Sequence, residues 1–170
     1  VLLLVTFLSS SVTSCHASTQ KAKAEKLLNE TELYPQELLD MLSRNPDMLD
    51  FVEDYPEKKG QVFADSIGKV KKGEYPLLLQ WDERWGYGNY GTSCIAVSGC
   101  APTVISMAIA GLTGEDSITP YTVATYAEEN GYYVPGSGTS WSLISEGIQH
   151  FGLFGQELPL SKDSVFQTLD

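Results

Sequence analysis

Cys100 has the sequence surroundings of a reactive thiol. Gly99 precedes it and Pro102 follows, a pattern typical of a turn that enters a helix. Apolar residues then recur at helical spacing, at Val104, Ile105, Ala108, Ile109 and Leu112. Gly111 and Gly114 are expected to end this helix. The N–H groups and dipole at a helix start favour the thiolate and would face an oxyanion, so Cys100 is a candidate nucleophile. A small buried cysteine at the start of a structural helix fits the same pattern.

Short motifs surround Cys100. They are QWDERWG at 80–86, SGCAPT at 98–103, LTG at 112–114, TP at 119–120 and GTSW at 138–141. Together they resemble the bacterial cysteine peptidase-like family related to the bacteriocin-leader peptidases, the peptidase C-thirty-nine-like group of papain-fold proteins. The resemblance covers residues 73–170. The lead-in YPQELLDMLSRNPDMLDFVEDYPEKK, residues 34–59, is similar to the helical segment that often precedes this domain.

The resemblance implies an α+β chain with a papain-like cysteine peptidase fold, here mainly its helical half, preceded by short helices. It implies a thiol hydrolase that acts on peptide or cell-wall cross-link amide bonds, with Cys100 as nucleophile and Gln80 as the oxyanion-hole glutamine. Two features depart from the family: Ala101 stands where Gly is usual, and the Gln80–Cys100 gap is long compared with the leader peptidases. The alternative role for Gln80 is a structural amide that pins the loop from Trp81 to Trp85.

A papain-type mechanism needs a histidine to take the thiol proton and return it to the leaving amine. The sequence has two, His16 in the targeting region and His150 beside the apolar stripe of an expected helix over 141–151. His150 is therefore interpreted as a boundary residue. In the resembling family the base lies on a strand, and no alternating strand pattern follows Cys100. We expect residues 1–170 to lack the catalytic His and its orienting Asp or Asn, as an N-terminal piece that is inactive alone. The alternative is a short protein that has lost catalysis, a non-catalytic surface-binding module with a papain-like groove.

Composition excludes several classes of function. The chain has 22 acidic and 11 basic residues, a net charge of −11, which argues against nucleic-acid binding. Two His and three Cys without a CxxC pair give no metal site, and no cofactor is expected. Cys94, in an expected extended loop, could form a disulfide with Cys100. The Gly-rich aromatic loop over 132–141 could form the wall of a peptide or glycan groove, or could simply pack.

The first residues indicate export. An apolar run, VLLLVTFL, is followed by small residues, which is typical of a secretory signal. Val12-Thr13-Ser14-Cys15 resembles a lipobox, with Cys15 as the lipidated residue; ordinary cleavage after Cys15-His16-Ala17 is the alternative. Either way we expect an extracytoplasmic protein, secreted or anchored to the bacterial cell surface, that touches membrane only through a lipid anchor. Its expected partner is a peptide or peptidoglycan substrate.

The chain therefore divides into a signal or lipobox segment (1–15), a helical lead-in (16–72) and the peptidase-like part (73–170). In the lead-in we expect helices over 22–28, from Pro35 onwards, and from Asn45-Pro46 to an end at Tyr55-Pro56. Further helices are expected from Thr119-Pro120 to Asn130-Gly131 and from Ser161 onwards. The lead-in is either a packing arm, the interpretation we favour, or a partner-binding or prodomain-like segment.

Overall fold

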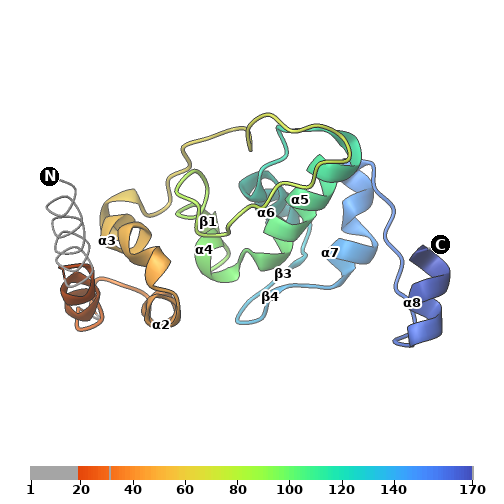
Figure 1. The fold of residues 1–170 in the computed structure, drawn as a ribbon. Coiled ribbons are helices and arrows are strands. Elements are labelled where there is room, and N and C mark those ends of the chain that lie inside the picture. Colours follow the sequence, from red (N-terminus) through yellow and green to blue (C-terminus); the bar gives the residue numbers. More distant parts are fainter. Residues whose placement is uncertain (1–18, 31, 170) are drawn as a thin grey trace, which may run out of the picture.

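The computed structural model describes residues 19–30 and 32–169 (Figure 1). The predicted signal segment, the lipobox with Cys15, and His16 all lie outside the described residues. The described chain is largely helical with two small antiparallel hairpins, so it is broadly α+β. Residues 19–27 are helical. The elements that follow are α2 (Gln36–Arg44), η1 (Pro46–Met48), α3 (Leu49–Lys58), β1 (Asn89–Tyr90), β2 (Ser93–Cys94), α4 (Ile95–Ser98), α5 (Cys100–Thr113), α6 (Pro120–Glu129), β3 (Tyr133–Val134), β4 (Gly138–Thr139), α7 (Ser142–Ser145), η2 (Gly147–Phe151) and α8 (Lys162–Leu169).

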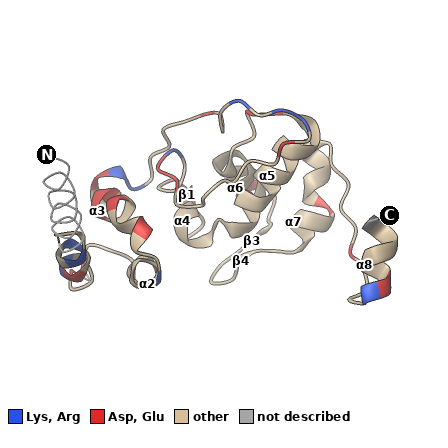
Figure 2. Cartoon of the chain, viewed as in Figure 1, with Lys and Arg blue, Asp and Glu red and all other residues tan. Residues whose placement is uncertain are grey.

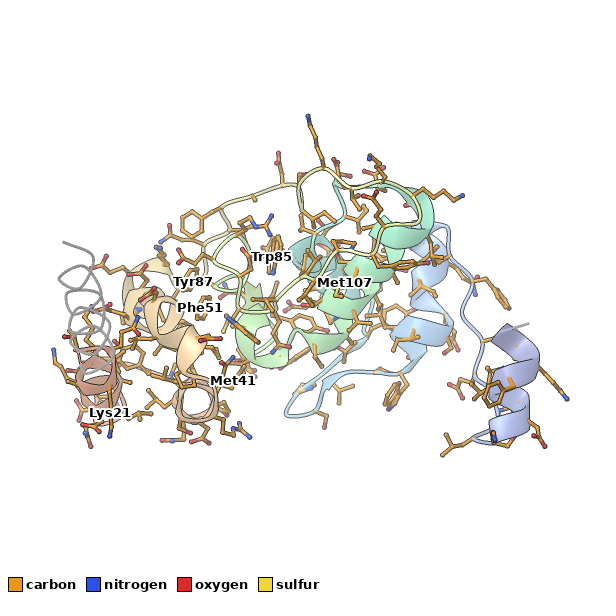
Figure 3. All side chains as sticks on the ribbon, in the orientation of Figure 1. Lys21, Met41, Phe51, Trp85, Tyr87 and Met107 are labelled. Atoms are coloured by element: carbon orange, nitrogen blue, oxygen red, sulfur yellow. The ribbon has the colours of Figure 1, made fainter. Side chains whose placement is uncertain are left out.

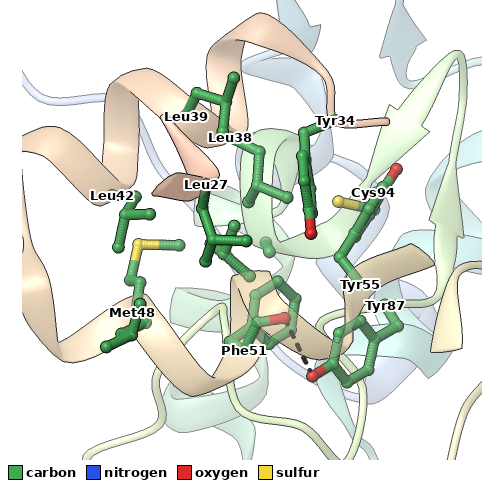
Figure 4. Packing of buried hydrophobic residues seen from close by; sticks show 13 residues of the cluster. Leu27, Tyr34, Leu38, Leu39, Leu42, Met48, Phe51, Tyr55, Tyr87 and Cys94 are labelled. Atoms are coloured by element: carbon green, nitrogen blue, oxygen red, sulfur yellow. Dashed lines mark hydrogen bonds between the residues drawn. The ribbon is translucent and has the colours of Figure 1, made fainter. Parts of the chain in front are cut away.

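The lead-in helices pack onto the rest of the chain through a shared core (Figure 4). This core joins buried side chains of α2, η1 and α3 to Tyr87, Cys94 and Ala96. Phe51 of α3 stacks on Tyr87 with ring centroids 4.1 Å apart, and the Tyr87 hydroxyl donates to the Phe51 carbonyl at 3.2 Å (Figure 3). The lead-in is thus a packing arm whose core crosses the boundary near residue 73.

A second core lies between α5 and α6. Ile105 and Ile109 of α5 face Val123 and Ala127 of α6, and Trp85 is buried in the same cluster. Its indole N–H donates to the Leu79 carbonyl at 2.9 Å. This bond closes the loop before β1, and the buried Trp85 ring packs that loop into the same core as α5, the helix that begins at Cys100.

The helix starts predicted from the sequence are present, because caps and prolines act locally. The Thr119 hydroxyl accepts a hydrogen bond from the Thr122 N–H at the start of α6, and Ser161 does the same for Ser164 before α8. Pro35 lies directly before α2, and Pro46 opens η1.

The predicted end of α3 is wrong. The helix continues through Pro56 to Lys58, although a proline removes one helical N–H donor. The Lys59 N–H still donates to the Tyr55 carbonyl at 2.9 Å, and Lys58 binds both Asp54 and Glu83. These interactions hold the last turn after the proline.

The face that α5 buries is also different from the prediction. Val104 and Leu112 are 60% and 47% exposed, whereas Ile105 and Ile109 are buried. Because α6 covers only one side of α5, the predicted stripe is too wide. Gly111 lies inside the helix, and only Gly114, with φ +83°, ends it. A side chain at Gly111 would collide with the ring of Tyr75.

Residues 141–151 form two short helices, α7 and η2, where the sequence predicts one. The break lies at Glu146 and Gly147; a Cβ on Gly147 would lie 2.8 Å from Leu143 and 3.0 Å from Tyr132. A short hairpin, β3–β4, follows Cys100, in the part of the chain where the sequence shows no alternating strand pattern. Two-residue strands are too short to show an alternating pattern. Leu77 to Leu79, expected as a short buried strand or an extended entry, form no strand, and Leu78 is buried whereas Leu77 and Leu79 are exposed.

Candidate active site

Cys100 is the first residue of α5, and its thiol is exposed and free. The chain turns from α4 into α5 at Gly99, where a Cβ would lie 2.6 Å from the Ile95 carbonyl oxygen. The Gly99 carbonyl in turn accepts from both the N–H and the hydroxyl of Thr103, at 2.9 and 2.8 Å. The glycine therefore permits the sharp turn, and the helix start that carries the thiol is fixed by hydrogen bonds.

Cys94 has the opposite environment. It ends β2 and precedes α4, where the sequence predicts an extended loop, and only 1% of its surface is exposed. Burial raises the pKa of its thiol, against hydrogen bonds from nearby backbone N–H groups. Both thiols are free, so the structure has no disulfide between Cys94 and Cys100.

Cys100 lies on the wall of a pocket of about 530 Å³. Four parts of the chain supply the wall: α2, the β1–β2 hairpin with α4, the start of α5, and the β3–β4 hairpin with α7. The lining residues are Glu37, Thr92, Ser93, Val97, Ser98, Cys100, Ala101, Tyr133, Gly136, Ser137, Gly138, Thr139, Ser140, Trp141 and Ile144. The Gly-rich aromatic loop predicted as a possible groove wall thus lies beside Cys100.

Hydrogen bonds join the two hairpins next to the pocket. The hydroxyls of Tyr90 and Thr139 are 2.7 Å apart, and the Tyr133 hydroxyl accepts from the Thr92 N–H at 3.2 Å. The rings of Tyr90 and Tyr133 meet edge to face at 5.0 Å. Gly91 turns the first hairpin with φ +60°, and any side chain there would overlap the Tyr133 ring. The two hairpins are therefore tied to each other where they line the pocket.

Tyr90 is fully buried beside this wall. Burial raises the pKa of its hydroxyl, the hydrogen bond with Thr139 opposes this, and Tyr133 and Cys100 raise it further. Tyr90 thus remains a neutral hydrogen-bonding group at neutral pH.

Gln80 is half-buried, and its side-chain N–H donates to the Ala96 carbonyl at 2.5 Å. It is not among the residues that line the pocket. This hydrogen bond fits the structural alternative, because it ties the loop before Trp81 to α4. One of the two amide hydrogens is thereby used, and the oxyanion role stays a prediction.

His150 lies away from Cys100. Its ring stacks on Tyr126 at 4.2 Å and meets Phe151 edge to face at 4.9 Å. It lines a separate depression with Glu129 and Asn130, among other residues. Within the part of the chain that the structure describes, no imidazole lines the Cys100 pocket.

Glu37 is a lining residue that sequence reasoning did not assign to any site. It lies in α2, in the lead-in for which a packing arm is the favoured interpretation and a partner-binding or prodomain-like segment the alternative. The signal for a helix there is clear, but sequence spacing does not reveal which distant loop that helix adjoins. Thr92 was missed for the same reason, since the hydrogen bond from its N–H to the Tyr133 hydroxyl joins segments 41 positions apart.

Across 19–30 and 32–169, no three His, Cys, Asp or Glu side chains cluster as they would around a metal ion. No helix in these ranges combines the length and apolar character needed to cross a membrane.

No protein-family model matches the sequence, and neither a curated protein nor a solved structure matches it significantly.

Proposed function

We propose that this chain belongs to an extracytoplasmic thiol hydrolase with a papain-like fold, which cleaves amide bonds in peptides or cell-wall cross-links. The observation that carries the proposal is an exposed, free thiol at the first residue of α5, on the wall of a pocket of about 530 Å³. Its volume falls in the range of small-molecule and peptide-side-chain sites, roughly 300–1,000 Å³.

The chemistry would be acyl transfer. The Cys100 thiolate attacks the amide carbonyl carbon, and the oxyanion lies towards the N–H groups at the start of α5. The Gln80 amide would assist through its second hydrogen. Departure of the amine requires a proton from an imidazole. Because His150 is in a separate depression, this proposal requires a histidine outside the described residues.

The second candidate is a non-catalytic binding module for the same ligands. The observation in its favour is that no imidazole among the described residues lines the pocket. The pocket would then hold a peptide or glycan against Tyr133 and Trp141 without attack by Cys100.

The full-length gene product tests both candidates on a mixed peptide library and on purified cell wall. For the hydrolase we expect turnover that Cys100→Ala reduces to background, a loss of at least roughly 10²–10⁴-fold. Cys94→Ala is the matched control and should keep its activity once folding is verified. Absence of turnover, together with ligand binding that Cys100→Ala leaves unchanged, would replace the hydrolase with the binding module.

A further inference from the structure

The Cys100 pocket has one formally charged side chain on its described wall, and the lead-in supplies it. Glu37 lies in the first turn of α2, is exposed, and lines the pocket. Apart from the cysteine, the other described lining residues have small, hydroxyl-bearing, aliphatic or aromatic side chains. The electrostatic character of this wall therefore depends on Glu37.

No cation neutralises Glu37. In the described part of the chain it belongs to none of the ion pairs, and no Lys or Arg lines the pocket. Figure 2 shows that α4, α5 and the β3–β4 hairpin carry no charged residues. A second carboxylate lies next to the rim, where Glu128 accepts a hydrogen bond from the Gly91 N–H at 3.2 Å. The formal side-chain charges at and beside the pocket are therefore negative.

The pocket also offers aromatic faces. Trp141 is 79% exposed and lines the pocket, as does Tyr133. Indole and phenol rings attract ammonium and guanidinium groups by cation–π interaction. An unpaired carboxylate, an exposed indole and a half-buried phenol ring in one pocket are complementary to a cation and unfavourable for an anion.

We propose that Glu37 determines specificity, and that it selects a peptide with an ammonium or guanidinium side chain beside the bond presented to Cys100. That the ligand is a peptide rests on the proposed function; the preference for positive charge is a property of the pocket alone. The lead-in is then part of the binding site as well as a packing arm.

The test measures the charge preference of Cys100 with two methanethiosulfonate reagents, one carrying a trimethylammonioethyl group and the other a sulfonatoethyl group. In both reactions the thiolate attacks the sulfenyl sulfur, a disulfide forms and methanesulfinate leaves. Rates are followed by mass analysis of the proteolytic fragment that contains Cys100. We expect Glu37→Gln to lower the cation-to-anion rate ratio by roughly threefold to tenfold at low ionic strength, with a smaller effect in high salt.

Glu57→Gln is the matched control, because it removes the same charge from an exposed position on α3 that does not line the pocket. Glu37→Asp should keep most of the preference, and thermal unfolding midpoints verify that each variant is folded. Equal ratios in wild type and Glu37→Gln, or equal losses in Glu37→Gln and Glu57→Gln, would overturn the proposal.

This measurement needs no catalytic turnover, so it can contradict the role of Glu37 without contradicting the hydrolase proposal, and the reverse. A Glu37-dependent ratio without hydrolysis would leave a cation-selective binding pocket. If the full-length protein hydrolyses substrate but the cation-to-anion rate ratio does not depend on Glu37, the hydrolase proposal stands and Glu37 does not determine its specificity.

Discussion

Cys94 and Cys100 lie six positions apart in opposite surroundings, the one buried in the core of the lead-in and the other exposed on a pocket. Alkylation requires access and a thiolate, and Cys94 has neither, because burial hides the sulfur and raises the pKa of its thiol. We expect iodoacetamide to modify Cys100 at least about 10²-fold faster than Cys94 under native conditions, since Cys94 reacts only after local opening. Mass mapping measures both rates. Equal rates, or a resting Cys94–Cys100 disulfide, would remove the support for Cys100 as nucleophile.

Asp82 gives the stability an acid dependence of known sign. Burial alone would raise the pKa of its carboxyl group, but hydrogen bonds from the side chain and N–H of Arg84, at 2.8 to 3.0 Å, hold it below the usual 3.8. A lowered pKa in the folded state stabilises the protein above the unfolded-state pKa, and this contribution is lost as the pH falls through the folded-state value.

Asp82→Asn should therefore lower the free energy of unfolding near neutral pH, and the difference from wild type should shrink below about pH 4. Urea unfolding at a series of acidic pH values measures this difference. Asp65→Asn, at an exposed position outside the ion pairs of the described residues, is the matched control. A difference that stays constant through the acid range would contradict the assignment to the Asp82–Arg84 pair.

At the scale of elements, α2 and the pocket-bearing part of the chain share one core. Leu38 of α2 is fully buried there, whereas Leu33, just before the helix, is 59% exposed. We expect Leu38→Ala to cost about 2–5 kcal/mol of unfolding free energy, and Leu33→Ala to change it by less than about 0.5 kcal/mol. Because the core is shared, urea unfolding should remain one transition by both Trp fluorescence and circular dichroism. Two transitions, with only the first moved by Leu38→Ala, would show that the lead-in unfolds separately.

The helices could be predicted where local chemistry decides them. Thr119 caps α6 with its own hydroxyl, a signal contained in three neighbouring residues. The predictions fail where residues far apart in the sequence determine where a helix ends or which face it buries. Pro56 stays helical because Lys58 after it binds Glu83, 25 positions along the chain. Val104 is exposed because α6 covers only the opposite side of α5, which helical periodicity does not show.

The candidate site likewise has a part that could be predicted from neighbouring residues and a part that could not. Cys100 at a helix start follows from Gly99 and Pro102 beside it. Two other features depend on how segments far apart in the sequence pack: Glu37 lies on the same pocket, and Gln80 donates to Ala96. No short sequence pattern contains either feature. The position of His150 is intermediate: its place beside an apolar stripe was predicted, but its stacking partner Tyr126 was not.

At the scale of the whole molecule, we expect residues 1–170 alone to show no hydrolytic turnover. A thiolate can attack once, but no imidazole among the described residues lines the pocket, so no acid there protonates the leaving amine, help worth roughly 10²–10⁴-fold. The measurement compares this chain with the full-length gene product on the same peptides. Turnover by residues 1–170 that disappears in His150→Ala would show that His150 reaches the thiol after all.

The pocket wall runs from Glu37 in α2 to Ile144 in α7, so more than half of the chain separates its first and last contributors. Closing so long a loop carries an entropic cost before any contact across the pocket repays it, and long-range contacts slow folding. Each helix can form early from its own neighbours, whereas the concave surface exists only once both ends of this span have docked. Recognition is therefore the last property that the folding chain acquires, and the first lost when either end detaches.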